Sequence, residues 1–312
     1  MTLCRRAVAA GLALALATAL SPRDMPSGAL GAGTVGFLGV GTINSAVCRG
    51  LCTLAPELRP SEVLLSPRGA AKAAALAADF PGVCRVCETN QAVVDGSDTL
   101  FLAMLPQQAE ECCRALRFKP GQRVISLLAG TNHSRVCGFV APVPSGDVAR
   151  AVPLPPVKDH RGVTVVYAPA DADGGGGASA AGALAAAVFD ALGTAVPCAS
   201  EEEMATLQVG TTLMGTYYAL LRAMTSWMVA RGVGEDVAAV YVGRMMHSVA
   251  GDAAAAGAAG VGALIAEQTP GGFNEQAIRE LTEAGVFDEV AHTMDSIEAR
   301  WAGREHKRPR RE

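Results

Sequence analysis

The stretch Val35–Asn44 has the sequence VGFLGVGTIN, and it decides the expected fold. Apolar residues lead into two glycines spaced G-x-G, and an amphipathic helix is predicted from Ile43. A strand, a tight glycine turn and a helix in this order begin a dinucleotide-binding domain. Gly39 permits the turn, Gly41 lets the backbone approach a pyrophosphate, and the helix N-terminus offers N–H groups to that anion. Asn44 stands where the fingerprint has Gly or Ala, so the stretch alone also fits an ordinary strand–turn–helix.

The composition indicates a two-domain globular protein. The chain has 312 residues, of which 50% are hydrophobic, and its net charge of -4 argues against a nucleic-acid binder. Nine cysteines are scattered through apolar segments, which favours reduced thiols over a disulfide framework. Cys84-x-x-Cys87 has no second pair and no histidine at ligand spacing, so packing in a strand is expected rather than a metal or redox role.

Both ends of the chain are expected to lie outside the fold. Residues 1–33 hold an apolar run after Arg5-Arg6 that is too short to span a bilayer, so we expect no stable membrane insertion. The run fits a presequence for a plastid or mitochondrion, or an unprocessed Ala-rich extension of a cytoplasmic protein. Residues 303–312 are basic and are expected to form a disordered, solvated tail.

Residues 34–199 are predicted to form a Rossmann domain with a doubly wound parallel sheet, because short apolar runs alternate with helical segments. The expected strands are residues 34–38, 62–66, 83–87, 99–104, 123–128, 147–152, 162–167 and 194–198. Ligands bind at the carboxyl ends of such strands. The pair Asp159-His160 lies in a proline-rich loop and is a candidate proton donor, although an imine that arrives protonated needs none.

The end of the second strand indicates the cofactor. An NAD site places Asp or Glu there, whereas this strand ends in Ser66-Pro67-Arg68. A hydroxyl and a guanidinium suit a 2′-phosphate, so NADP(H) is preferred and NAD(H) is possible. A surface arginine in a turn is the alternative.

Residues 200–302 are predicted to be an all-α dimerisation and substrate domain. Ser200 and Glu203 form a capping box that opens a long helix to about residue 230. Further helices are expected at residues 235–256, 273–284 and 287–301, separated by glycine-rich breaks. These helices are apolar on more than one face, which predicts a homodimer or a higher homo-oligomer.

At this point the chain resembles the pyrroline-5-carboxylate reductase family from about Val35 to Trp301. The resemblance rests on the glycine turn and on the segments Ser66–Arg68, Asn90, Ser97–Ala103 with Pro106-Gln107, Ile125–Gly130, Arg150–Pro153 and Thr269–Gly272. It implies a Rossmann domain, a helical dimerisation domain and reduction of the C=N bond of a cyclic imino acid by NAD(P)H. Pyrroline-5-carboxylate, reduced to proline in proline biosynthesis, is the implied substrate.

The resemblance also implies roles for individual residues. Gly39, Gly41, Thr42 and Ile43 are implied to bind the pyrophosphate, Ser66 and Arg68 the 2′-phosphate, Asn90 the adenosine side, and Ala103, Leu105 and Pro106 the nicotinamide side. Gly271 and Gly272 precede a helix whose N-terminus suits a substrate carboxylate, and Asn274 adds a donor. Thr211 and Thr212 are candidates to offer hydroxyls to the substrate nitrogen, with bonding back to their own helix as the alternative.

The sequence departs from the family where the substrate would bind. Leu154–Pro156 replaces Asn-Thr-Pro, Gln208–Leu213 replaces a Ser-Gly-x-Gly-Pro-Ala run, and Phe273 with Asn274 replaces a small residue and Thr. An NADPH-binding protein with a different imine or carbonyl substrate, or without turnover as a sensor or scaffold, is therefore the alternative. A β-hydroxyacid dehydrogenase needs a lysine in the first long helix, and residues 200–301 contain none.

Overall fold

The computed structural model describes residues 33–169 and 179–304. The expected extension, apart from residue 33, and the basic tail from residue 305 lie outside the described residues. The chain divides into two compact units, the first ending at Ala205 and the second beginning at Thr206. Within the described ranges, no helix is both long enough and apolar enough to cross a membrane.

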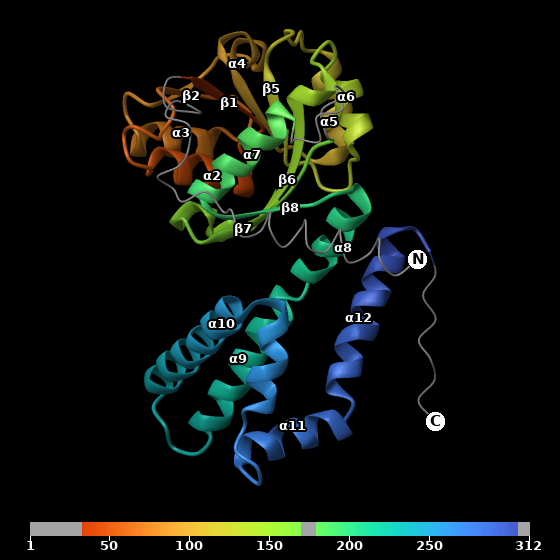
Figure 1. Ribbon diagram of the computed structural model, residues 1–312. Helices are drawn as coiled ribbons and strands as arrows, with labels where there is room; N and C mark the ends of the chain where they lie inside the picture. The colour runs from red at the N-terminus through yellow and green to blue at the C-terminus, as the bar shows by residue number, and fades with distance from the viewer. Residues whose placement is uncertain (1–32, 170–178, 305–312) are drawn as a thin grey trace. The chain divides into compact units, whose positions relative to one another are not determined.

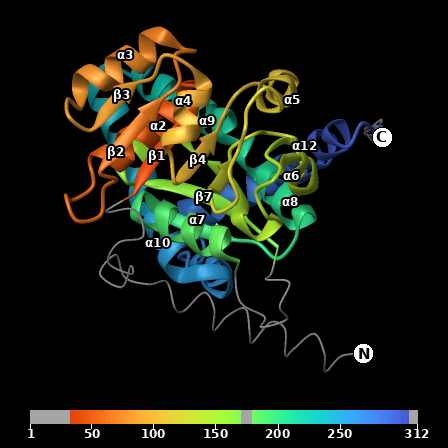
Figure 2. The ribbon, with the colours of Figure 1, turned by 90° about the horizontal axis from the view of Figure 1, so that it is seen from above.

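The first unit is built on an eight-stranded sheet in the order β3-β2-β1-β4-β5-β6-β7-β8 (Figure 1). The strands are β1 (Thr34–Leu38), β2 (Glu62–Leu65), β3 (Cys84–Val86), β4 (Thr99–Leu102), β5 (Arg123–Ser126), β6 (Val148–Pro153), β7 (Gly162–Tyr167) and β8 (Gly193–Pro197). The helices between them are α2 (Thr42–Cys52), α3 (Ala70–Asp79), α4 (Asn90–Gly96), α5 (Pro106–Arg114), α6 (His133–Phe139) and α7 (Ala180–Ala191). Figure 2 shows β1 between β2 and β4, so the strand order reverses beside the glycine turn that follows β1.

The predicted Rossmann-type sheet is confirmed, with one correction. Strands β1 to β6 pair in parallel and β8 pairs in parallel with β7, but β7 is antiparallel to β6. The segment between Pro153 and Gly162 holds only the short 3-10 helix η2 (Pro155–Asp159). A parallel step needs a crossover of a dozen or more residues, so this short connection can only reverse the chain.

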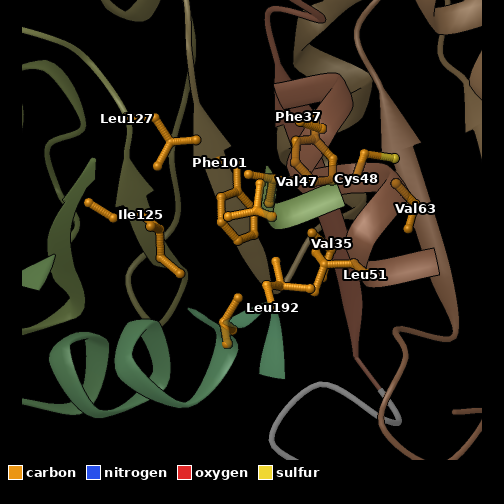
Figure 3. Close-up of a cluster of buried hydrophobic side chains, with 14 of the residues drawn as sticks. Val35, Phe37, Val47, Cys48, Leu51, Val63, Phe101, Ile125, Leu127 and Leu192 are labelled. Atoms are coloured by element: carbon orange, nitrogen blue, oxygen red, sulfur yellow. The ribbon is translucent and has the colours of Figure 1, made fainter. Parts of the chain in front are cut away.

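Two hydrophobic layers hold the sheet between its helices. On one face, α2, α3 and α7 pack on residues of β1, β2, β4 and β5, and on the other face α4, α5 and α6 pack on the alternate residues. In the first layer, the rings of Phe37 and Phe101 stack with centroids 5.0 Å apart (Figure 3). Phe189 of α7 meets Phe101 edge-on at 6.4 Å. Since successive strand residues point to opposite faces, a continuously apolar strand such as β4 serves both layers.

The second unit is all-helical within the described residues, as predicted. Helix α8 (Glu201–Thr211) begins in the first unit, and α9 (Met214–Val229), α10 (Glu235–Ala266), α11 (Phe273–Glu283) and α12 (Val286–Trp301) follow. One of the two bonds of the capping box is present, because the Glu203 N–H donates to Ser200 Oγ. The Glu203 carboxylate accepts from the N–H of Ala199, one residue before the expected cap.

In this unit one helix and one break were predicted too long. The long helix expected from Ser200 is divided between α8 and α9 near Thr212. The break expected after Ala256 is present at Gly257, whose φ of 64° is not helical, but it is one residue long, because the helical segment beyond it continues to Ala266. Glycine tolerates this positive φ, so one such residue is enough to kink the helix.

Candidate cofactor site

A pocket of about 510 Å³ opens at the carboxyl ends of β1, β2, β4 and β5. It is lined by Gly39, Val40, Gly41, Thr42, Ile43, Arg68, Gly69, Ala103, Met104, Leu105, Gln108, Leu127 and Ala129. All of these residues belong to the first unit. The pocket lies beside the reversal of strand order, where open α/β sheets bind their ligands.

The two glycines of the turn have different physical roles. Gly39 has a φ of 84°, and a Cβ atom on it would lie 2.6 Å from the carbonyl oxygen of Ala103, so only glycine fits there. Gly41 has a φ of -83°, and the nearest neighbour of an added Cβ is 3.9 Å away. The fold therefore requires glycine at position 39, whereas at position 41 glycine keeps the pocket open for a ligand.

Helix α2 begins directly under this pocket. Its N-cap residue is Gly41, and no side chain caps its first turn. The first N–H groups of a helix have no partner within the helix, and the helix dipole favours negative charge at this end, so this end of α2 suits an anion. The donors and the opening at Gly41 fit the pyrophosphate of a dinucleotide.

Asn44, the departure from the glycine fingerprint, stabilises the turn. Its side chain is fully buried, and Nδ2 donates to the carbonyl oxygens of Gly39 at 2.6 Å and Leu38 at 3.4 Å. Its Oδ1 is buried and has no hydrogen-bond partner among the described residues. The Asn44 amide thus links the first turn of α2 to the carbonyl oxygens of Leu38 and Gly39. A Gly or Ala side chain at this position could not donate these hydrogen bonds.

We expect Asn44→Ala to lower the free energy of unfolding by about 1–2 kcal/mol, because it removes hydrogen bonds to two carbonyls but also an unpaired oxygen. Asn44→Asp is expected to cost more, since it places a carboxylate against those carbonyls. Urea denaturation of both variants measures the two costs. A carboxylate variant as stable as the alanine variant would contradict the assigned bonding.

The end of β2 presents a cation to the pocket. Arg68 lines the pocket and is exposed, and its carbonyl oxygen accepts from the Val40 N–H of the glycine turn. Ser66 is fully buried, and its Oγ accepts from the Gly39 N–H at 2.9 Å. Ser66 therefore shapes the turn in this structure, while Arg68 is the group placed to reach a phosphate.

A second cation beside the pocket was missed in the sequence. Lys72, on the first turn of α3, donates from Nζ to Thr42 Oγ1 at 2.8 Å. Thr42 is a pocket residue, so the ammonium lies at the edge of the site. One sequence signal for this cation was available. Lys72 follows Arg68 by four residues, just after the start of the helix that follows β2.

Of the other cofactor residues expected from the resemblance, some line the pocket and some do not. Ala103 and Leu105 line the pocket, and Pro106 is the first residue of α5. Asn90 is the first residue of α4, its Nδ2 donates to Cys112 Sγ, and its Oδ1 has no partner among the described residues. Asn90 does not line the pocket, so the described contacts assign it no ligand.

The expected substrate residues lie in the helical part of the chain. The Thr211 hydroxyl donates to the Gln208 carbonyl at 2.7 Å, and the Thr212 hydroxyl donates to the Val209 carbonyl at 2.6 Å. This is the bonding of each hydroxyl back to its own helix that was weighed as the alternative. The hydroxyl protons are thus in use, and only the oxygens remain available, as acceptors.

The turn before α11 has the conformation expected at a helix N-terminus. Gly271 has a φ of 72°, and Gly272 is the N-cap of α11. The Gly271 N–H donates to Glu275 Oε2 at 2.6 Å, and the Asn274 side chain donates to Gln268 Oε1 at 2.8 Å. A carboxylate of the chain itself therefore holds the donor that was expected to bind a substrate carboxylate.

His160, the candidate proton donor, lies away from the pocket. Its Nε2 is 2.9 Å from the Gly50 carbonyl oxygen and 3.1 Å from Thr53 Oγ1, at the C-terminal end of α2. The pocket uses the opposite end of the same helix. His160 is thus a capping residue of α2.

The fold and the pocket define a Rossmann-type fold with a pocket at the carboxyl ends of its strands, followed by a helical unit. Residues 34–130 match the family model described as NADP oxidoreductase, coenzyme F420-dependent, which covers less than half of the chain. A comparison of the sequence with curated proteins finds no match.

Among solved structures, pyrroline-5-carboxylate reductases share this fold. The enzyme from Streptococcus pyogenes has a TM-score of 0.71 at 21% identity, over 87% of this chain and 98% of that chain. The enzyme from Coxiella burnetii has a TM-score of 0.72 at 19% identity, over 87% and 98% of the two chains. The Plasmodium falciparum enzyme, solved with NADP bound, has a TM-score of 0.67 at 15% identity, over 86% and 96%.

Proposed function

We propose that this chain is an NADPH-dependent reductase of the C=N bond of a small cyclic imine, with pyrroline-5-carboxylate as the first candidate substrate. The observation that carries the proposal is the pocket at the carboxyl ends of the strands, where an open glycine turn, an uncapped helix N-terminus and two cations meet. The shared fold with reductases of this substrate supports it.

In this proposal each end of the cofactor has its own residues. Gly41, Thr42 and Ile43 hold the pyrophosphate on the N–H groups of α2, and Arg68 with Lys72 holds the 2′-phosphate. Ala103 and Leu105 line the side proposed for the nicotinamide. When bound, the nicotinamide supplies the hydride that reduces the imine carbon.

The chain's own part in the chemistry is to orient the imine. The Thr211 hydroxyl already donates its proton to the Gln208 carbonyl, so its oxygen can only accept a hydrogen bond. In this proposal it accepts that hydrogen bond from the N–H of the protonated imine. Thr212 is equivalent in its bonding, and Asn274 offers an amide near the turn before α11. No strong general acid is required, since a protonated imine brings its own proton.

The second unit is proposed to form a homodimer or a higher homo-oligomer. Helix α9 contains no buried residue in the single chain, and Tyr218, Leu220 and Trp227 on it are exposed. On α10, Val237, Val240 and Tyr241 line an apolar groove of about 730 Å³. Exposed apolar side chains of this kind favour burial against a second copy, and light scattering of the purified chain measures the oligomeric state.

The test of function is oxidation of NADPH by the full-length chain with pyrroline-5-carboxylate, followed by its absorbance at saturating cofactor. A matched panel contains cyclic imines with and without a carboxylate. Turnover on any of these imines supports the proposal, and tight NADPH binding without turnover on the whole panel overturns it. The panel is included because Glu275 already occupies the Gly271 N–H, an arrangement that favours an imine without a carboxylate.

We expect Glu275→Ala to lower the KM for pyrroline-5-carboxylate several-fold and to leave the KM of an imine without a carboxylate unchanged, because the variant frees the Gly271 N–H. Glu280→Ala, on the same helix and paired with Gln276, is the matched control. Equal changes for both imines would show that Glu275 acts on helix stability alone.

A further inference from the structure

Three cysteines far apart in the sequence meet in the first core layer. Cys48 and Cys52 lie one turn apart on α2, and Cys84 is the first residue of β3. Cys84 Sγ is 3.9 Å from Cys48 Sγ and 3.4 Å from Cys52 Sγ, and all three sulfur atoms lie within 4.8 Å of one another. We call these three residues the thiol cluster.

The thiol cluster is buried beside apolar side chains. Figure 3 shows Cys48 among the residues of the first layer, which include Phe37 and Val63. Within residues 33–169 and 179–304, no fourth His, Cys, Asp or Glu joins the three. Arg49, which lies next to Cys48 on α2, is paired with Asp79 at 2.6 Å.

The three sulfur atoms are close enough together to reach one ion. A thiolate is the form that binds metals, so binding requires that the thiols lose their protons.

We propose that Cys48, Cys52 and Cys84 bind one thiophilic metal ion, with Cu(I) as the best fit. Thiolates are soft ligands that select ions such as Cu(I) and Zn²⁺. An ion about 2.3 Å from three sulfur atoms in a plane sets them about 4.0 Å apart, close to the separations observed. Structural Zn²⁺ takes four ligands, whereas Cu(I) is stable with three, so the ligand count favours Cu(I).

The position of the cluster allows an ion to enter and gives its binding a consequence. Strand β3 is an edge strand and Cys84 is 7% exposed, so the ion reaches the cluster from the sheet edge. Binding releases the thiol protons to solvent. Cys48 lies about 9 Å along α2 from Thr42, so the ion fastens α2 to β3 without entering the cofactor pocket.

The test is a titration of the reduced full-length chain with Cu(I) under anaerobic conditions, in competition with a chromophoric Cu(I) chelator. We expect one equivalent of tightly held Cu(I) per chain, three sulfur neighbours by X-ray absorption, and a rise in Tm. Cys52→Ala is expected to lose this equivalent. Cys113→Ala, which removes a buried thiol outside the cluster, is the matched control and is expected to keep it.

Several results overturn the proposal. These are failure of the wild-type chain to compete with the chelator, coordination of Cu(I) by fewer than three sulfur atoms, and an unchanged stoichiometry in folded Cys52→Ala. Circular dichroism and NADPH binding establish whether that variant is folded. If it is not, the X-ray absorption result, combined with alkylation mapping of which cysteines Cu(I) protects in the wild type, decides alone.

Discussion

Replacement of Gly41 by alanine is expected to lower the affinity for NADPH roughly a hundredfold, about 2.8 kcal/mol, while the chain remains folded. Gly41 has an ordinary φ of -83°, and an added methyl group has no neighbour closer than 3.9 Å, so the fold itself accepts alanine. The same methyl group projects into the pocket at the helix N-terminus proposed for the pyrophosphate. The expected loss is therefore one of binding and not of stability.

Two glycine variants separate these effects. Gly39→Ala is expected to destabilise the fold by several kcal/mol, because position 39 combines a φ of 84° with a clash at 2.6 Å. Gly138→Ala, on an exposed part of α6 with open space around it, is the matched control and is expected to leave the affinity unchanged and to stabilise the fold by at most about 1 kcal/mol. NADPH fluorescence titration and thermal melting are measured for all three variants. Retained NADPH affinity in Gly41→Ala would contradict the proposed position of the pyrophosphate.

The second large effect is expected at Arg68. Arg68→Ala is expected to weaken NADPH binding roughly 30-fold, about 2 kcal/mol, and NADH binding by less than about threefold. Arg68 lines the pocket after β2, the place proposed for the ribose of the dinucleotide, and only NADPH carries a 2′-phosphate on that ribose. Calorimetric titration of the variant with both cofactors measures the ratio.

The controls for Arg68 use other cations of the same domain. Lys72→Ala is also expected to weaken NADPH binding more than NADH binding, but by a smaller factor, because Lys72 lies at the pocket edge beside Thr42. Arg123→Ala, at the amino end of β5, is exposed at the opposite edge of the sheet and is expected to affect neither cofactor. Equal losses of NADPH and NADH in Arg68→Ala would remove the assignment of the 2′-phosphate.

The pattern of short apolar runs and glycine turns was sufficient to predict the parallel core of the sheet. Strands such as β4 are buried on both faces, so their residues are continuously apolar, and their ends are marked by Gly, Pro or Ser. The antiparallel step from β6 to β7 was not predicted. The direction of a strand depends on the length of the preceding connection and on which edge of the sheet is free to pair. The residues of the strand itself indicate neither.

The backbone of the candidate site and its Arg68 were predicted, whereas the contacts of Asn44 and Lys72 were missed. Gly39 and Gly41 were found because glycine is the sequence mark of a tight turn and of a close ligand. Lys72 follows Arg68 by four residues, but its contact with Thr42 joins two different helices, and the bond from Asn44 to the Gly39 carbonyl depends on how α2 packs on the turn. The thiol cluster is the extreme case, because Cys84 lies 36 residues from Cys48 in the sequence and the two meet only when β3 packs beside α2.

The amino-acid sequence by itself determined the class of fold, the strand–turn–helix at Val35–Asn44 and the cation at Arg68, because these depend on residue type and on spacing over a few positions. Only the tertiary structure decided that Asn44 supports the turn, that His160 caps α2 and that Glu275 holds the Gly271 N–H. The physical reason is that a hydrogen bond or a metal ligand set requires atoms within a few ångströms, and packing alone sets which side chains come that close.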